Sequence, residues 1–213
     1  MHGLVDPFLV LVLLINLFML STSRLQAVVN ASAAQGVVLG LITFFIHQHL
    51  GVWAVLVTLV AIVIKGIVIP GMLLRAARDA AIRREVEPFI GFLPSLLLGA
   101  LGTGAALLFA STLPLAKEHV GSVVVPASLA TVWTGFLILT TRRKAINQVV
   151  GYLVLENGIY IMGLTLIDAM PIMVELGVLL DLFVGIFVMG IIIAHISREF
   201  SSMDTDNLSE LKD

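Results

Sequence analysis

Most charged residues lie at the ends of apolar runs or between them, but three stand well inside such runs. Lys65 and Glu156 each lie near the middle of such a run, and Asp181 lies about ten residues into another. A charged side chain at the centre of a bilayer costs about 2.5–3.5 kcal/mol on insertion scales, and such residues normally face a bundle interior or a water-filled cavity. Desolvation disfavours the charged form of both group types, so a buried carboxyl or amine can change protonation near neutral pH. We therefore interpret the three as a proton or cation relay; the alternative is an ion pair of Lys65 with Glu156 or Asp181 that only fixes helix packing.

Four further polar residues form a secondary group of candidates. Glu175 could be an outer proton acceptor or simply an interfacial charge, and His195 could relay protons at physiological pH or merely anchor a helix end. Gln35 and Asn157 are amides inside apolar runs, where interhelical hydrogen bonding is the default and coordination of water is the alternative. Glycines inside the runs indicate close helix packing: Gly36, Gly40, Gly151, Gly158, Gly185 and Gly190.

The composition shows which solvent must surround these residues. Of 213 residues, 59% are hydrophobic and 12% are charged, whereas about a quarter of a soluble domain is charged. The mean hydropathy is +1.10. In hydrocarbon only helices or closed barrels satisfy every backbone polar group, and the apolar runs lack the alternation of barrel strands. The sequence therefore predicts an all-α, polytopic membrane protein.

About seven runs are long enough to cross the hydrocarbon core, which needs roughly 20 apolar residues. They cover residues 4–22, 27–47, 51–74, 89–113, 121–141, 146–167 and 171–196.

The basic residues predict how these helices are oriented. One side of the predicted bundle holds Arg24, Arg75, Arg78, Arg83, Arg84, Arg142, Arg143, Lys144, Arg198 and Lys212, and the other side holds Lys117. An excess of Lys and Arg marks the cytoplasmic face. We therefore expect a multi-pass protein of the cell (inner or plasma) membrane with its N-terminus outside and its C-terminus in the cytoplasm.

Several kinds of chemistry have no support in the sequence. The chain has no cysteine, which excludes disulfides and thiolate-bound metal or iron–sulfur centres on its own residues. We find no nucleotide-binding glycine loop, no metal-spaced histidine cluster, no Ser/His/Asp arrangement and no basic stripe suited to nucleic acid. We therefore expect a chain that binds no metal or cofactor and is not an enzyme on its own.

A weak internal repeat suggests how the chain is organised. Residues 22–27 are similar to residues 141–145, and residues 63–69 are similar to residues 187–193. Parallel repeats of this kind occur in membrane transporters. The sequence thus predicts two three-helix repeats flanking a central helix: an N-terminal unit over 1–80, a connecting fourth helix within 81–120, and a C-terminal unit with its tail over 121–213.

The C-terminal unit resembles subunit K of complex I, a small three-helix membrane subunit. The resemblance rests on residues 135–143, on Gly151 followed by Glu156, on Asp181 followed by Gly185, and on the tail 206–212. There are departures. The second-helix carboxylate of subunit K falls about three residues earlier, where Leu153 stands here, and Asp181 replaces a glutamate.

The whole chain resembles component E of hydrogenase-4, a membrane subunit of formate-hydrogenlyase-type complexes. The similar segments are Lys65 and the apolar stretch to Pro70, residues 150–158, Glu175 leading to Asp181, and the tail 206–208. This resemblance implies a non-catalytic subunit of a redox-driven ion pump such as a group 4 hydrogenase. Nickel–iron and iron–sulfur centres would belong to partner subunits. The implied partners are antiporter-like membrane subunits and the membrane subunit that anchors the redox module.

Three hypotheses about function follow from these observations. In the first, Lys65, Glu156 and Asp181 contribute to proton or cation translocation in such a complex. In the second, the same charges only hold helices and neighbouring subunits together. In the third, the chain belongs to a multi-subunit sodium/proton antiporter without a redox partner. The sequence does not choose between protons and sodium as the coupling ion.

Overall fold

The computed structural model describes residues 2–46, 52–79, 89–113 and 122–163, and every regular element within them is helical. The helices are α1 (His2–Ser21), α2 (Leu25–Ile46), α3 (Val52–Val63), the π-helical segment η1 (Ile64–Val68), α4 (Ile69–Asp79), α5 (Phe92–Thr112), α6 (Val124–Thr141) and α7 (Ala145–Gly163). Together α3, η1 and α4 form one continuous helix. The prediction of an all-α polytopic membrane protein is confirmed.

Six of the seven predicted spans correspond to described helices. Four helical stretches are long and apolar enough to cross a membrane: Leu25–Phe45, Thr58–Arg75, Phe92–Thr112 and Val124–Thr141; α1 contributes a shorter apolar helix, Val5–Ser21. The seventh predicted span, 171–196, lies outside the described residues, so a total of seven stays a prediction.

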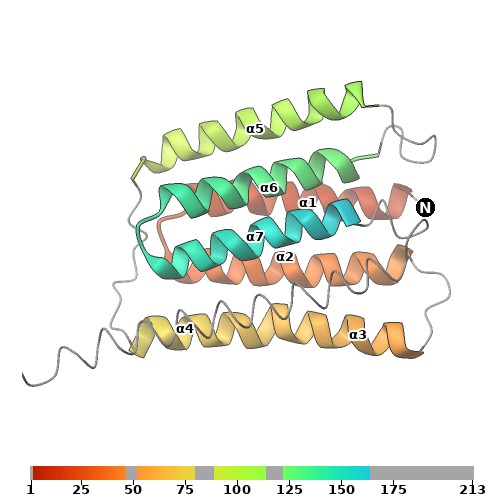
Figure 1. Cartoon of the computed structure of the whole chain (residues 1–213), viewed down its shortest axis with the longest axis horizontal. Coiled ribbons are helices and arrows are strands. Elements are labelled where there is room, and N and C mark those ends of the chain that lie inside the picture. Colours follow the sequence, from red (N-terminus) through yellow and green to blue (C-terminus); the bar gives the residue numbers. More distant parts are fainter. Residues whose placement is uncertain (1, 47–51, 80–88, 114–121, 164–213) are drawn as a thin grey trace, which may run out of the picture.

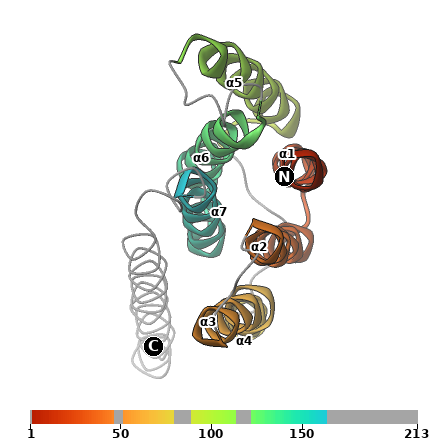
Figure 2. The ribbon, with the colours of Figure 1, turned by 90° about the vertical axis from the view of Figure 1, so that its right-hand side faces the viewer.

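The helices run along one common direction in two rows (Figure 1). Seen end on, α1, α2 and the α3–α4 helix form one row, and α5, α6 and α7 form the other (Figure 2). Between the rows α1 packs on α5 and α6, and α2 packs on α7. The four helices α1, α2, α6 and α7 thus form the centre of the bundle, with α5 and the α3–α4 helix at its sides.

The side helices present apolar faces outward. On α5, Leu101 and Leu108 are 69% and 73% exposed, and Ile67 beside α4 is 67% exposed. In water such surfaces would be unstable, whereas a lipid environment or an apolar neighbouring subunit accommodates them.

The central helices bury two separate apolar clusters. One, which we call the basic-end cluster, includes Leu20, Leu25, Ile138 and Ile146. The other, the far-end cluster, includes Val5, Leu9, Ile42, Val124 and Ile161. On each of the four central helices, buried polar side chains lie between the residues of these two clusters, and Thr43 and Asn147 are buried polar residues outside this zone.

Candidate functional site: an ion pair and a belt of hydrogen bonds

A layer of buried polar side chains crosses the bundle between the two apolar clusters. We call it the polar layer. Its members come from α1, α2, α6 and α7 and are at most 5% exposed: Asn16, Ser32, Gln35, Ser128, Thr131, Thr134, Glu156 and Asn157. Buried polar groups are costly unless they are hydrogen-bonded. Four members of this layer bond with one another, two serines bond to backbone carbonyls, and Glu156 pairs with Lys65.

Lys65 and Glu156 form an ion pair at the edge of the polar layer. The Nζ atom of Lys65 lies 2.5 Å from Oε1 of Glu156, and the two side chains are 16% and 4% exposed. Burying two charges costs several kcal/mol per ion, and their attraction repays this cost only with good geometry. The structure shows Lys65 paired with Glu156, one of the two partners predicted for it; the other, Asp181, lies outside the described residues.

The backbone around Lys65 departs from a regular α-helix. Lys65 lies in η1, where the Ile69 N–H bonds to the carbonyl of Ile64, five residues back. Pro70 follows immediately, and its ring removes the N–H that would have bonded to Gly66 four residues earlier. A π-turn absorbs that local mismatch, and such turns often accompany functional sites. The sequence prediction described residues 51–74 as a simple helix and missed this segment.

Glycine allows α2 to approach the Lys65 segment closely. A Cβ atom built on Gly36 would lie 3.0 Å from Cβ of Lys65, and one on Gly40 would lie 2.2 Å from a side-chain carbon of Ile62. The predicted close packing at both glycines is confirmed. Because Gly36 follows Gln35, the same turn of α2 contacts Lys65 and contributes an amide to the polar layer.

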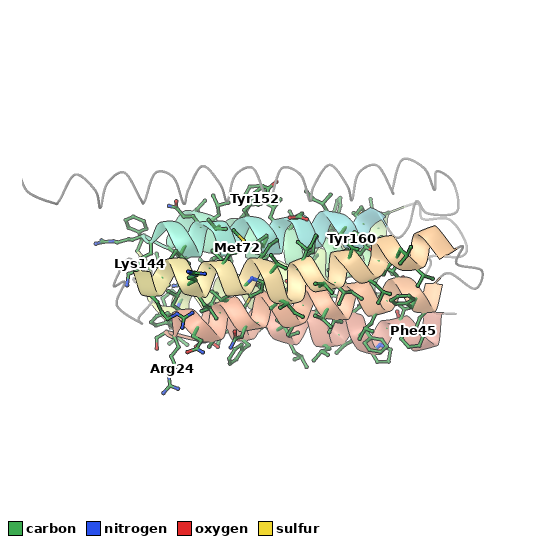
Figure 3. All side chains as sticks on the ribbon, turned by 90° about the horizontal axis from the view of Figure 1, so that it is seen from below. Arg24, Phe45, Met72, Lys144, Tyr152 and Tyr160 are labelled. Carbon is green, nitrogen blue, oxygen red and sulfur yellow. The ribbon has the colours of Figure 1, made fainter. Side chains whose placement is uncertain are left out.

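Tyr160 lies one turn beyond Glu156 on α7 and covers the other side of the lysine. The Lys65 ammonium is 5.7 Å from the centre of the Tyr160 ring, within the range of a cation–π contact. The Tyr160 hydroxyl is hydrogen-bonded to Thr43 of α2. Figure 3 shows Tyr160 on α7 beside the α3–α4 helix. Lys65 is thus held by a carboxylate, an aromatic face and a glycine contact.

A chain of hydrogen bonds joins the four central helices. Asn157 Nδ2 donates to Gln35 Oε1 at 3.2 Å, and Gln35 Nε2 donates to Asn16 Oδ1 at 2.8 Å. Asn16 Nδ2 donates to Thr131 Oγ1 at 2.8 Å, and Thr131 Oγ1 donates to the Ala127 carbonyl at 2.6 Å. We call Asn157, Gln35, Asn16 and Thr131 the amide chain. It runs from α7 through α2 and α1 to α6.

The remaining side of this arrangement is closed by direct contact between α6 and α7. Ser128 Oγ donates to the Gly158 carbonyl at 2.8 Å. A Cβ atom on Gly158 would lie 2.6 Å from the Val132 nitrogen, and one on Gly135 would lie 2.5 Å from the Leu155 nitrogen. The amide chain and this seam therefore form a closed belt that begins and ends on α7 beside Glu156.

Comparison with known proteins gives two kinds of relative. The chain is 34% identical over 193 residues to the uncharacterized protein Rv0085 of Mycobacterium tuberculosis, covering 89% of this chain and 87% of that protein. The chain belongs to the Rv0085 family. It is also 26% identical over 210 residues to hydrogenase-4 component E of Escherichia coli K12 and of Shigella flexneri, covering 95% of the chain and 94% of each relative.

These relatives support only part of the resemblances read from the sequence. The similarity to component E extends over nearly the whole chain, as the quoted segments predicted. The resemblance of the C-terminal unit to complex I subunit K stays a prediction. No family model matches the chain, and no solved structure matches it.

For this Rv0085 relative, the structure brings together four of the seven residues predicted to take part in ion movement. Lys65 and Glu156 pair directly. Gln35 and Asn157 bond to each other, which is the interhelical hydrogen bonding expected by default. The other three predicted residues, Asp181, Glu175 and His195, lie outside the described residues. Within the described ranges no group of three or more His, Cys, Asp or Glu side chains could hold a metal ion.

Sequence reasoning missed Asn16 and Thr131 of the amide chain. It also missed the hydrogen-bonded pair of Tyr160 and Thr43. Asn16 is an isolated amide in the middle of the apolar run 4–22, the same signal that singled out Gln35, so it could have been found. Thr131, Thr43 and Tyr160 carried no such signal, because hydroxyl residues are common in membrane helices and often bond to their own backbone.

Proposed function

We propose that this chain is a non-catalytic membrane subunit of a multi-subunit hydrogenase-like complex, and that the Lys65–Glu156 pair takes part in moving protons or another cation through it. The name of the component E relatives, which match the chain over 94% of their length, supports the kind of assembly. The ion pair supports the role within it. In this proposal, the redox chemistry and its nickel–iron and iron–sulfur centres belong to partner subunits.

The observation that carries the proposal is the ion pair at the edge of the polar layer. Both groups are largely removed from solvent, and their reacting atoms are 2.5 Å apart. Desolvation weakens the preference for the charged pair over a neutral amine and carboxylic acid. In the proposed path a proton passes directly between Nζ and Oε1, so that either group receives it from one side and releases it to the other.

The proposal assigns Asp181 to the same path, as a third group that exchanges protons with this pair. It places antiporter-like subunits and the membrane anchor of the redox module beside the chain. The exposed apolar faces of α5 and the α3–α4 helix suit lipid or such neighbours equally well. Glu175 and His195 would be outer and inner contacts of the path.

The ion pair also favours a specific second hypothesis, a purely structural role. Removing one partner of a buried pair leaves an uncompensated charge and is strongly destabilising. If the pair only holds α7 against η1, substitutions should lower the yield of assembled complex and leave the activity of what assembles unchanged. The antiporter alternative predicts sodium/proton exchange in a complex that contains no redox subunit.

The decisive experiment compares Glu156→Gln with wild type in inverted vesicles that contain the intact complex. We expect proton pumping per assembled complex to fall at least about tenfold, because loss of a proton-transferring side chain typically costs two or more orders of magnitude in enzymes. Asp181→Asn is expected to behave in the same way. Asp6→Asn, which neutralises a carboxylate on α1 outside the polar layer, is the matched control and should pump normally.

The result that would contradict the proposal is equally specific. Normal pumping by fully assembled Glu156→Gln and Asp181→Asn complexes would remove both groups from the ion path. Reduced assembly together with normal pumping per complex would establish the structural role instead.

A further inference from the structure

The hydrogen-bond belt around the four central helices has a direction that its end point determines. The Thr131 hydroxyl has one hydrogen, and it points to the Ala127 carbonyl at 2.6 Å. Its oxygen must therefore accept from the Asn16 amide group. That contact fixes the orientation of the Asn16 amide, which accepts from Gln35, which in turn accepts from Asn157. One hydroxyl on α6 thus sets the orientation of three amides on three other helices.

The amide chain is unsuited to carrying protons. A primary amide has no readily accessible charged form near neutral pH, so it neither takes up nor releases a proton as a relay must. The chain also ends at the backbone carbonyl of Ala127, which passes nothing further. Gln35 and Asn157, which the sequence placed among the secondary relay candidates, therefore have another task.

The position of the belt indicates that task. Asn157 follows Glu156 on α7, and Gln35 precedes Gly36, whose Cα faces the Lys65 segment at close range. The Asn157–Gln35 hydrogen bond holds α7 to α2, and the ion pair made by the preceding residue, Glu156, holds the same turn of α7 to Lys65 in η1. On the far side of Asn157, the Gly158 carbonyl accepts from Ser128. The turn of α7 that carries Glu156 is held from two directions.

We propose that Asn16 and Thr131, two residues whose hydrogen bonds reach neither member of the ion pair, are positioning residues for Glu156. Through Gln35 and Asn157 they fix the rotation and depth of α7 so that the carboxylate meets Lys65 and not a neighbouring water or backbone group. This inference rests on the proposed function of the ion pair. It predicts that loss of one hydroxyl on α6 disturbs a carboxylate on α7 to which it is not hydrogen-bonded.

The test uses the intact complex and four variants. Thr131→Val removes the hydroxyl and preserves the side-chain shape, whereas Thr131→Ser keeps the hydroxyl. Thr140→Val is the matched control, because Thr140 makes the same kind of bond to its own helix, to the Phe136 carbonyl at 2.7 Å, on an exposed face. Asn16→Leu interrupts the amide chain from a second helix.

Two readouts separate this inference from the proposed function. The first is the infrared signal of the Glu156 carboxyl group in the purified complex, identified as the signal that Glu156→Gln abolishes. The second is the number of protons pumped per turnover in vesicles. We expect Thr131→Val and Asn16→Leu to shift or broaden the Glu156 signal and to lower the pumping ratio at least twofold. Thr131→Ser and Thr140→Val should match wild type in both.

Each outcome decides the question. An unchanged Glu156 signal in assembled Thr131→Val and Asn16→Leu would overturn the positioning role even if Glu156→Gln stops pumping. A shifted Glu156 signal in Thr131→Val and Asn16→Leu, together with normal pumping by the Glu156→Gln complex, would keep the positioning role and reject the proposed function. Failure of both Thr131→Val and Asn16→Leu to assemble, with Thr131→Ser normal, would make the belt a requirement for assembly and reject its positioning role.

Discussion

Arg142 is the most deeply buried basic side chain in the described part of the protein, and it joins three helices. It follows the last residue of α6, is 2% exposed, and donates from Nη2 to the Leu20 carbonyl at 3.1 Å. Its guanidinium lies 5.1 Å from the centre of the Phe92 ring at the start of α5. Burial lowers the pKa of Arg142 from its ordinary value, but a guanidinium stays charged at physiological pH. Since Leu20 is near the end of α1, the positive charge meets the negative end of that helix.

We therefore expect Arg142→Leu to destabilise the protein by about 1.5–3 kcal/mol, the usual loss for a hydrogen bond to a charged group. Arg142→Lys should recover only part of this, because an ammonium lacks the planar group that stacks on Phe92 while bonding to Leu20. Arg143→Leu is the control, since Arg143 is exposed and its guanidinium lies 4.7 Å from the centre of the Phe89 ring. Thermal unfolding of the purified protein in detergent measures the stability of all three variants against wild type. Equal losses of stability in Arg142→Leu and Arg143→Leu would contradict a role of Arg142 in stabilising the end of α1.

At the residue level, the sequence predicted which side chains needed partners, and for Lys65 it named Glu156 and Asp181 without choosing between them. Lys65 and Glu156 could be singled out because charge inside an apolar run is rare and costly. Their pairing depends on the rotation of α7 against the α3–α4 helix, which glycines at the contacts and a π-turn before Pro70 determine. Arg142 was read as one of many basic residues marking an orientation, because nothing in a basic turn predicts burial against the end of another helix.

The α6–α7 pair is held by direct contact between backbones. A Cβ atom on Gly151 would lie 2.7 Å from the Leu139 nitrogen and 3.0 Å from the Gly135 carbonyl oxygen. Backbone atoms cannot swing aside as a flexible side chain can. In membranes, where apolar side chains gain little by leaving lipid, such close approach is a main source of helix association.

We expect Gly151→Ala to push these helices apart and to destabilise the bundle by about 1–3 kcal/mol, as overpacking of a well-packed core does. Gly104→Ala on α5 is the matched control, because nothing lies within 4 Å of its added Cβ, and replacing glycine within a helix is otherwise favourable. The fraction of protein that stays monodisperse after heating in detergent distinguishes them. Comparable behaviour of the two variants would show that the seam tolerates separation.

Helix positions were predictable from the sequence, whereas helix ends and interruptions were not. The apolar runs located all six described helices, counting α3, η1 and α4 as one, and they placed most helix ends to within a few residues. The third helix extends to Asp79, five residues beyond its predicted end at 74, because Arg75 and Arg78 continue an amphipathic turn outside the apolar run. Hydropathy detects where a helix leaves hydrocarbon, and it does not detect where hydrogen bonding stops.

At the scale of the whole molecule, the two helical hairpins α1–α2 and α6–α7 are arranged alike. Both turn at the same end of the bundle and lie side by side across the polar layer (Figures 1 and 2). The α1–α2 hairpin forms the first two helices of the repeat predicted over 1–80, and the α6–α7 hairpin forms the first two helices of the repeat predicted over 121–213. The connecting helix lies between the two. The third helix of the second repeat lies outside the described residues, so the repeat stays a prediction.

The two ends of the bundle differ in charge. The turns and helix ends at one end carry the basic residues of the described part other than Lys65: Arg24, Arg75, Arg78, Arg142, Arg143 and Lys144. Figure 3 shows Arg24 and Lys144 together at that end and Phe45 at the other. Because basic loops are retained in the cytoplasm during insertion, we expect the basic end to face the cytoplasm, which would put the N-terminus outside.

The absence of cysteine from the chain makes this orientation testable with single introduced thiols. Ser23 is exposed in the turn between α1 and α2 at the basic end, and Thr112 is exposed at the opposite end, where α5 finishes. In intact cells, or in spheroplasts where an outer envelope blocks the reagent, we expect a membrane-impermeant maleimide to label Thr112→Cys at once and Ser23→Cys only after the membrane is permeabilised. Inverted vesicles should give the reverse order. If intact cells gave the reverse labelling order, the bundle would have the opposite orientation, with the N-terminus in the cytoplasm. The Lys65–Glu156 pair would keep its contacts in either orientation, but the side from which it receives a proton would change.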